Sequence, residues 1–431
     1  MLLIYTPKIT TRLNYVFKQV CLRILNIPFE FTTKIEDFIA YDGMKMSYTK
    51  KPLGSEIFIQ AHELLFETGF TDIDINVYPW EQTKCFFKVG DKSSLPFDIF
   101  AASFFLLSRY EEYLPHVKDD YGRFPAHESI AYKNNFLKQP VVDIWANKFL
   151  EVLEEKYGKQ EFDNNTFKFK PVFDIPVAYK YKNKETIRTI AGITKSIIRL
   201  DFKSIIERFK VVLGFKRDPY DTFKWIINVH KKKRIVPTFF FLLGDYSSYD
   251  RNINHKNNHF ISLIKSVGDY ATLGLKVSYK ALDSIEVLKK EKERIETITN
   301  RTLSISRNSY TKINLPYSYR NLIDVEIKED MSMGYTTDIG FRAGTSFPFY
   351  FYDLDYEIQT PLKLIPFVIV DHVLLKKTTF AEREKILVDI LNQIKDVNGT
   401  FVPIFHNYTF NEEEQWKNFR KLYSELLKKI N

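Results

Sequence analysis

Apolar and polar residues follow one another along the chain in a pattern that predicts alternating strands and helices. Leu2–Tyr5 reads as a strand, and residues 9–25 read as a helix because apolar side chains recur there every three or four positions. A second helix is predicted over residues 99–114, with Asp98 placed to cap its first turn. The first part of the chain is therefore expected to be an α/β unit.

A more regular alternation begins after the polar segment at residues 158–165. Strands are predicted at residues 167–174, 235–243, 270–278, 303–305, 364–371 and 401–405. Helices are predicted at residues 202–213, 221–232, 255–267, 282–299, 317–325, 380–397 and 412–429. Such alternation is typical of a parallel sheet or barrel with helices outside it. We therefore expect an α/β fold with two domains, a smaller N-terminal α/β domain over residues 1–160 and a (β/α) barrel over residues 166–431.

Composition and charge narrow the class of protein. The 431 residues are 45% hydrophobic, as in a globular protein, and the net charge of +9 is spread along the chain, so no nucleic-acid partner is expected. The two cysteines, Cys21 and Cys85, predict no disulfide framework. No window holds the roughly 18 uninterrupted apolar residues of a membrane span, and Pro7 interrupts the apolar start before it reaches the length of a signal peptide. A cytoplasmic protein is expected.

Polar residues stand at the ends of several predicted strands. They are Asp174, Lys276, Arg307 with its neighbours Asn308, Ser309 and Tyr310, Asp371, and His406 with Asn407, while Arg342 lies in a loop of its own. In a parallel barrel the carboxyl ends of the strands form the active-site edge. These residues are therefore the candidates for a functional site.

The segments that carry these residues resemble one bacterial family. They are residues 173–179, 273–279, 307–310, 330–335, 340–345 and 406–407, together with residues 97–104, 108–113 and 120–124 in the first part of the chain. As an ensemble they resemble polysaccharide deacetylases of the NodB-homology type, in particular the group with an extra N-terminal domain of undefined function. The resemblance spans most of the chain and implies the deacetylase barrel.

The resemblance also implies a change at the metal site. In the family an Asp and two His hold a divalent cation that polarises the substrate carbonyl and activates water. The matching positions in this chain are Pro176, Lys276 and Ser309. Proline has no donor atom, an ammonium repels a cation, and a serine hydroxyl is a poor zinc ligand. No metal and no other cofactor is therefore expected.

Other positions match the family's catalytic residues. The resemblance implies that Asp174 is the general base, that Arg342 holds its carboxylate, and that His406 is the general acid. Two structural alternatives stay open: Arg342 pins a glycine-rich loop, and His406 belongs to a hydrogen-bonded turn. Binding roles are expected for Lys276, Ser309, Arg307, Asp371 and Asn407.

These features favour a saccharide-binding protein of surface-polysaccharide metabolism without metal-dependent hydrolysis. Its expected partner is an N-acetylated oligosaccharide or polysaccharide. One alternative is an active hydrolase of carbohydrate amides or esters that needs no metal and uses Asp174, Lys276 and His406. Another is a structural partner protein with a filled pocket. The sequence indicates no oligomeric state.

Overall fold

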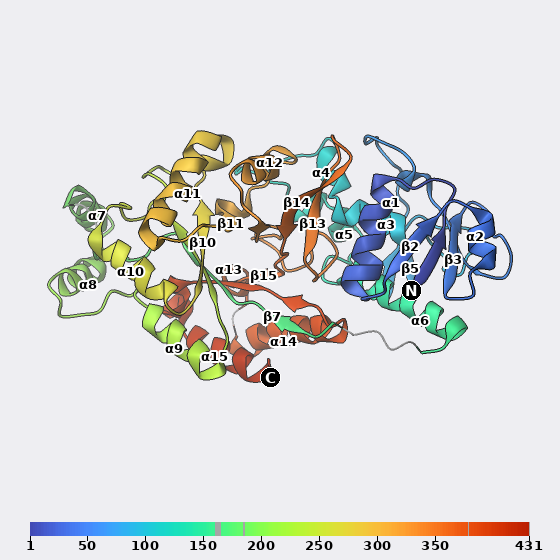
Figure 1. The fold of residues 1–431 in the computed structure, drawn as a ribbon. Helices are drawn as coiled ribbons and strands as arrows, with labels where there is room; N and C mark the ends of the chain where they lie inside the picture. The colour runs from blue at the N-terminus through green and yellow to red at the C-terminus, as the bar shows by residue number, and fades with distance from the viewer. Residues whose placement is uncertain (160–164, 184–185, 378, 431) are drawn as a thin grey trace.

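In the computed structural model, residues 1–159, 165–183, 186–377 and 379–430 are described. The segment expected at the domain boundary, residues 158–165, lies in part outside these described residues. Below, residues 1–159 are called the N-terminal region and residues 165–430 the C-terminal region. Figure 1 shows the two regions side by side, with the N-terminal region at the right.

A four-stranded parallel sheet forms the centre of the N-terminal region. Its strands are β1 (Leu2–Tyr5), β2 (Phe29–Thr32), β3 (Lys45–Thr49) and β4 (Ile57–Gln60), in the order β2-β1-β3-β4. The region also contains α1 (Thr11–Phe17), the π-helical turns η1 (Lys18–Ile24), α2 (Ile35–Ala40), α3 (Ile99–Leu107), α4 (Tyr110–Tyr113), α5 (Ile130–Lys133), α6 (Val141–Tyr157) and the hairpin β5 (Tyr78–Trp80) and β6 (Thr83–Cys85). The predicted α/β character of this region is confirmed by these elements.

The helix predicted over residues 99–114 is interrupted at Arg109. Asp98 caps α3 by accepting hydrogen bonds from the backbone N–H groups of Phe100 and Ala101. Arg109 has a left-handed backbone with φ of +55°, and it is buried. A non-glycine residue keeps such a conformation only where its surroundings hold it. The ion pairs of Arg109 described below stabilise this conformation.

A nine-stranded sheet forms the centre of the C-terminal region, in the order β13-β14-β12-β11-β10-β9-β8-β17-β15. The strands are β8 (Val172–Ile175), β9 (Thr238–Leu242), β10 (Thr272–Val277), β11 (Ile305–Asn308), β12 (Glu329–Asp330), β13 (Phe349–Asp353), β14 (Ile358–Leu364), β15 (Ile369–Val370) and β17 (Pro403–His406). All neighbouring strands are parallel except β13 and β14. A separate short pair joins β7 (Lys168–Phe169) to β16 (Thr400–Phe401).

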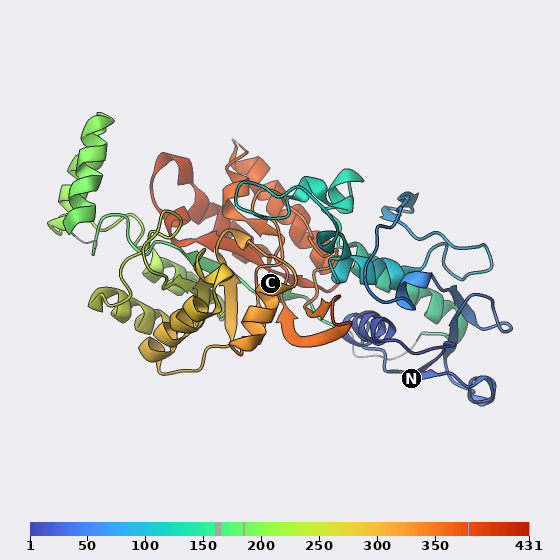
Figure 2. The same cartoon turned by 90° about the horizontal axis from the view of Figure 1, so that it is seen from above.

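Helices surround this sheet, as the alternating pattern predicts (Figures 1 and 2). They are α9 (Phe223–Lys233), α10 (Asn258–Gly268), α11 (Ile285–Thr299), α12 (Tyr317–Asp324), α13 (Asp371–Leu374), α14 (Phe380–Asp396) and α15 (Phe419–Lys429). Two more helices, α7 (Thr186–Ile198) and α8 (Phe202–Val212), form a pair that stands away from the sheet. Across the described part of the chain, each helix is too short or too polar to cross a bilayer.

The closed barrel predicted from the sequence is not seen. The sheet order ends at β13 and β15, and no pairing joins these two edge strands among the described residues. After β12 the sheet continues into the antiparallel hairpin of β13 and β14, which docks on the N-terminal region. There the Tyr15 hydroxyl donates to the Tyr350 carbonyl at 2.8 Å, and the Gln19 amide donates to the Pro348 carbonyl at 3.1 Å. The hairpin thus contacts α1 and η1 at this edge.

Alternate residues of the central strands face opposite sides of the sheet. Phe173 packs against Tyr423 of α15 and His230 of α9. Val172 and Phe240 belong instead to an apolar cluster on the other face, with Met331, Ile365, Phe367, Val370, Val402 and Ile404. Gly274 lies beside this cluster, and a Cβ atom there would lie 2.3 Å from the Phe240 ring. The space below the strand ends is therefore filled with apolar side chains.

Candidate functional site

Four strands bring polar side chains to one edge of the nine-stranded sheet. Asp174 lies two residues after Val172 on β8, so both face the same side of the sheet. Lys276 stands near the end of β10 and Arg307 near the end of β11, where the two are paired in register. His406 ends β17 and is paired in register with Asp174. The edge predicted from the sequence therefore carries these residues together.

Two cations share one oxygen of Asp174. Lys276 Nζ donates to Asp174 Oδ2 at 2.8 Å, and Arg307 Nε donates to the same oxygen at 2.9 Å. His406 Nε2 lies 4.0 Å from it. Asp174 is 2% exposed and Lys276 6%, while the other oxygen, Oδ1, is buried with no hydrogen-bond partner among the described residues. The two cations and Asp174 are called the charged triad below.

The charged triad determines the ionisation of Asp174. Burial raises the pKa of this carboxyl, but Arg307 and Lys276 outweigh burial and hold the pKa well below its usual range. Burial also lowers the pKa of the Lys276 ammonium, and Asp174 opposes that shift. With all three groups ionised, the triad holds one negative and two positive charges. The triad by itself therefore carries one surplus positive charge.

The residues at this edge do not fit the divalent cation that the family resemblance implies. Lys276 directs its ammonium to the carboxylate oxygen that faces the site. Pro176 offers no donor atom. Ser309 is buried in the turn Ser309–Thr311 and is the single ligand-type residue among the three replaced positions. A doubly charged cation here would meet two fixed positive charges, which repel it strongly at low dielectric.

Asp371 orients His406. It begins α13, and its carboxylate accepts hydrogen bonds from His406 Nδ1 at 2.9 Å and from the His406 backbone N–H at 2.7 Å. The carboxylate also accepts a bond from the Thr409 hydroxyl. Because a carboxylate only accepts, Nδ1 carries the proton and Nε2 is directed toward Asp174. Burial raises the pKa of Asp371, but His406 and His372 together hold it well below its usual range.

His372 is a member of the site that the sequence reasoning missed. Its Nδ1 lies 2.8 Å from Asp371 Oδ1, so the carboxylate stands between two imidazoles. Burial lowers the pKa of His372, but its hydrogen bond with Asp371 raises it overall. Asp371, His372 and His406 are residue types that bind metals, and their ligand atoms lie within 4.8 Å of one another. Here the Asp371 carboxylate is bonded to Nδ1 of both histidines, and His372 Nε2 lies 3.2 Å from the Tyr408 hydroxyl.

The structure does not place Arg342 against Asp174, so the expected contact is wrong. Arg342 donates from Nε and Nη2 to the two oxygens of Glu112, at 2.8 and 2.6 Å. Arg109 donates to the same carboxylate at 2.8 Å and to the Arg342 carbonyl. Burial raises the pKa of Glu112, but Arg342 and Arg109 lower it to about 2. The alternative of an arginine that pins the glycine-rich loop agrees with these contacts.

The side chains of two further predicted binding residues form no hydrogen bond with Asp174 or His406 among the described residues. Asn407 donates from its amide to the carbonyls of Val177, Ala178 and Tyr220, at 2.9 to 3.2 Å. It thereby ties the loop after β8 to the segment before α9. Ser309 starts the turn after β11. These contacts indicate a structural role for Asn407. Of the predicted binding residues, Lys276 and Arg307 contact Asp174, and Asp371 contacts His406.

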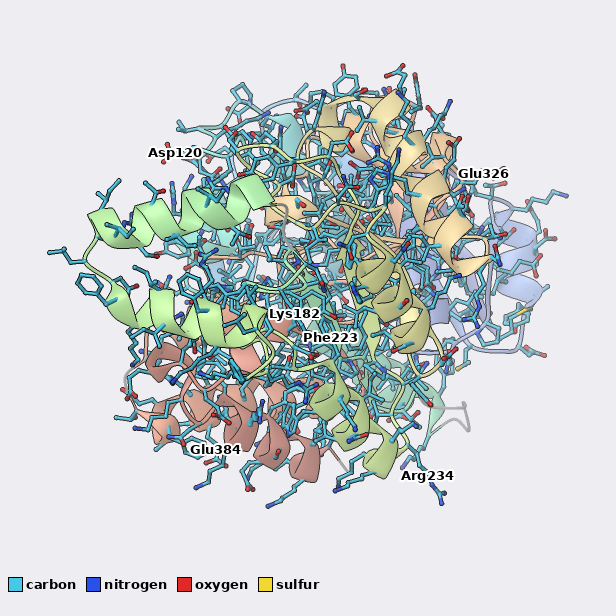
Figure 3. The ribbon with its side chains drawn as sticks, turned by 90° about the vertical axis from the view of Figure 1, so that its left-hand side faces the viewer. Asp120, Lys182, Phe223, Arg234, Glu326 and Glu384 are labelled. Atoms are coloured by element: carbon cyan, nitrogen blue, oxygen red, sulfur yellow. The ribbon has the colours of Figure 1, made fainter. Side chains whose placement is uncertain are left out.

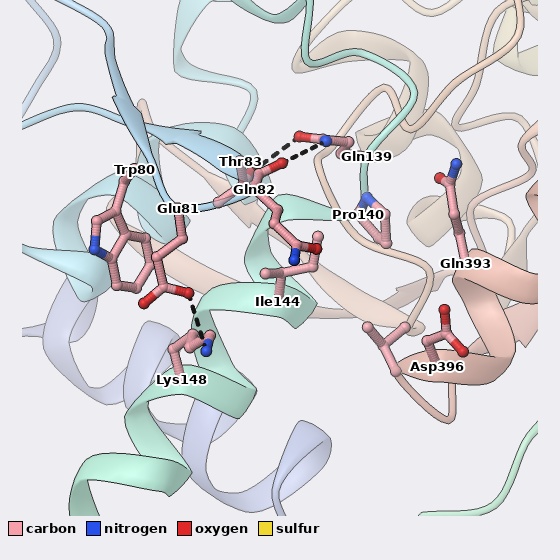
Figure 4. A pocket seen from close by; sticks show the side chains of 11 residues that line it. Trp80, Glu81, Gln82, Thr83, Gln139, Pro140, Ile144, Lys148, Gln393 and Asp396 are labelled. Atoms are coloured by element: carbon pink, nitrogen blue, oxygen red, sulfur yellow. Dashed lines mark hydrogen bonds and ion pairs between the residues drawn. The ribbon is translucent and has the colours of Figure 1, made fainter.

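A pocket of about 350 Å³ lies away from this edge (Figure 4). It is bounded by the β5–β6 turn, α6 and α14, and Lys148 pairs there with Glu81 at 3.0 Å. Gln139 accepts a hydrogen bond from the Thr83 hydroxyl at 3.0 Å. No residue predicted for the site lines this pocket.

Comparison with known proteins gives a family match for the first part of the chain alone. Residues 2–158 match DUF7033, a family of unknown function. No curated protein matches the chain. Both findings leave the C-terminal region without a family assigned by sequence.

Three solved structures are remotely similar. A protein assigned as a polysaccharide deacetylase from Mycobacterium smegmatis has a TM-score of 0.40 at 11% identity, over 63% of this chain and 86% of its own. A CE4 family pseudoenzyme from Bacillus anthracis has a TM-score of 0.32 at 9% identity, over 62% and 61%. A polysaccharide deacetylase from Bacillus cereus has a TM-score of 0.29 at 12% identity, over 62% and 88%. Likenesses this remote assign no activity to this chain.

Proposed function

We propose that this chain is a deacetylase-like protein that binds a saccharide and does not hydrolyse it. One observation carries the proposal: Lys276 Nζ lies 2.8 Å from Asp174 Oδ2 in a buried site. A metal-dependent deacetylase needs a cation with an open coordination position beside its catalytic base. In this chain a fixed ammonium holds the base, and an ammonium has no open coordination position.

The electrostatics of Asp174 weaken it as a general base. A base is most effective when its pKa lies near the working pH. The two cations stabilise the ionised form of Asp174 and hold its pKa well below the usual range. A proton taken from water would therefore be held weakly. This supports impaired hydrolysis.

Two features support a saccharide as the ligand. Asp174 Oδ1 is an acceptor without a partner among the described residues, and a sugar hydroxyl is a suitable donor. Tyr279 and Tyr310 come three residues after Lys276 and Arg307, and both contact Tyr249, with ring centroids 4.1 and 6.2 Å apart. Tyr121 of the N-terminal region stacks on Tyr310 at 4.9 Å. Such an aromatic cluster suits the apolar face of a sugar ring.

The test combines metal analysis with calorimetry. Purified protein is expected to contain no stoichiometric zinc, cobalt, nickel or manganese, and to bind N-acetylated oligosaccharides. Asp174→Asn is expected to weaken that binding, while Asp269→Asn, at an exposed site, is expected to leave it unchanged. About one metal ion per chain, or no binding of any N-acetylated oligosaccharide, would contradict the proposal.

A second candidate, a hydrolase that needs no metal, is favoured by the Asp371–His406 pair. His406 is held in the tautomer that a general acid–base histidine needs. Acetate release from N-acetylated or O-acetylated oligosaccharides, measured with a chelator present, separates the two candidates. We expect none. Release that survives chelation and disappears in His406→Asn would favour the hydrolase.

A further inference from the structure

The helical pair α7–α8 exposes an unusual amount of apolar surface. Ten large apolar side chains between residues 190 and 215 are exposed: Ile190, Ile197, Ile198, Leu200, Phe202, Ile206, Phe209, Val212, Leu213 and Phe215. Figures 1 and 2 show the two helices standing away from the body, at the end far from the N-terminal region. Figure 3 shows them side by side. Exposed apolar patches of this kind mark contact surfaces.

Three apolar residues of α8 and Leu213 directly after it form a stripe that faces outward. Phe202, Ile206, Phe209 and Leu213 recur at intervals of three or four residues, and their exposed fractions are 50–65%. A helix that packs on its own protein buries such a stripe and exposes its polar face. In α8 the apolar stripe is exposed instead of buried.

The inner side of α8 is mainly polar, and Val211 is the one fully buried apolar residue of this helix. Glu207 accepts a hydrogen bond from the Tyr181 hydroxyl at 3.2 Å and lies 3.6 Å from Lys180 Nζ. The Arg208 guanidinium lies over the Tyr181 ring at 4.9 Å. Lys180 in turn pairs with Glu413 of the loop before α15. The hairpin is thus attached to the body by a polar and ionic contact, which leaves the apolar stripe free to contact something else.

Basic side chains flank the exposed stripe. Arg199, Lys203 and Lys210 are exposed, while Asp201 is the exposed acidic residue of the described part of this segment. Lys216 and Arg217 are also exposed, but they pair with Glu207 and Asp221. Apolar side chains beside lysine and arginine are the pattern of helices that lie in the interface of an anionic membrane. A second copy of the chain is a poorer occupant, because two such surfaces would bring the same positive charges together.

We propose that the α7–α8 hairpin docks on the surface of a membrane that contains anionic lipid. The stripe of Phe202, Ile206 and Phe209 enters the boundary between headgroups and acyl chains, and Lys203 and Lys210 contact the phosphates. The helices have 13 and 11 residues, which is too short to span a bilayer. Because the hairpin follows β8 in the chain, docking holds the edge that carries Asp174 near the membrane.

Flotation with vesicles tests the apolar part of this proposal. The full chain is mixed with phosphatidylcholine vesicles that contain or lack phosphatidylglycerol. We expect flotation with the anionic vesicles, and at least about tenfold weaker binding for Ile206→Asp/Phe209→Asp. The matched control is Val117→Asp/Tyr317→Asp, which changes exposed apolar residues elsewhere. Circular dichroism checks that the variants stay folded, which is expected because the changed side chains are half exposed.

The charged part has its own pair of variants. Lys203→Gln/Lys210→Gln is expected to weaken binding about tenfold at low salt, whereas Lys289→Gln/Lys290→Gln on α11 leaves it unchanged. Equal binding to both kinds of vesicle, or no binding to either, would overturn the proposal. Light scattering measures the oligomeric state. If the wild type binds no lipid and is a dimer, and Ile206→Asp/Phe209→Asp is a monomer, the hairpin forms a contact between copies of the chain instead.

Discussion

Arg342 and Glu112 lie 230 positions apart in the sequence and form a buried ion pair with two hydrogen bonds. Arg342 belongs to the loop before β13, and Glu112 belongs to α4 of the N-terminal region. Both side chains are almost fully removed from solvent. This contact joins the two regions through charge as well as through packing.

Replacing Glu112 with glutamine is expected to destabilise the protein by about 3–5 kcal/mol, because it leaves the Arg342 and Arg109 guanidiniums buried without their shared anion. Denaturant unfolding measures the free energy. Glu414→Gln, at an exposed site, is the control and is expected to change stability by less than about 0.5 kcal/mol. A loss below about 1 kcal/mol for Glu112→Gln would show that solvent reaches the pair.

Asp143 of α6 predicts a pH dependence. It accepts hydrogen bonds from the Ser346 backbone N–H and hydroxyl, both at 2.7 Å, and burial raises its pKa from 3.8 to about 7. A raised folded pKa favours the protonated form, so this contribution is complete below pH 4 and is lost as the pH rises through 7. Wild type should lose a few kcal/mol relative to Asp143→Asn between pH 4 and 8, measured by unfolding. Asp389→Asn, which is exposed, should show no such trend.

Within the charged triad, removing the anion is expected to cost more than removing one cation. Asp174→Asn leaves Lys276 and Arg307 as two buried cations without a counter-charge, for an expected loss of about 3–5 kcal/mol. Lys276→Met leaves the Arg307–Asp174 pair in place, for an expected loss of about 1–2 kcal/mol. Unfolding at neutral pH compares the two variants. The reverse order would show that Lys276 is the main counter-charge of Asp174.

A triple substitution tests the family resemblance. Pro176→Asp, Lys276→His and Ser309→His together are expected to create zinc binding, because they supply three ligands at the matching positions and remove the ammonium. The control is Pro176→Asp with Ser309→His, in which Lys276 still repels the cation. Calorimetry with zinc measures both. A folded triple variant that binds no more zinc than the parent would count against the matching of these positions.

The predictable parts of the fold were the buried parallel strands and their helices. Strands β8, β10, β11 and β17 carry Asp174, Lys276, Arg307 and His406 near their carboxyl ends, and the parallel arrangement brings these four residues to one edge. The hairpin of β13 and β14 was missed, because its aromatic residues pack on another part of the chain and not on a local helix. The expected boundary near residue 160 stays a prediction.

The site was predictable as far as it depends on strand ends. Arg342 was assigned to the wrong carboxylate because its partner, Glu112, comes from the N-terminal region, and no local pattern indicates a contact over that separation. His372 was missed although it follows Asp371 directly. The adjacent acidic residue and histidine at a predicted strand end could have identified His372 as a candidate site residue.

The contacts between the two regions predict an unequal tolerance of mutation. Side chains of the N-terminal region donate hydrogen bonds to main-chain carbonyls of the C-terminal region. Tyr15 donates to the Tyr350 carbonyl, Gln19 to the Pro348 carbonyl and Arg109 to the Arg342 carbonyl. A carbonyl persists whatever side chain its residue carries, whereas the donor is lost when Tyr15 or Gln19 is replaced. These bonds therefore constrain Tyr15 and Gln19 and place no demand on the side chains at positions 348 and 350, although the Tyr350 ring is separately contacted by the Arg23 guanidinium at 4.5 Å.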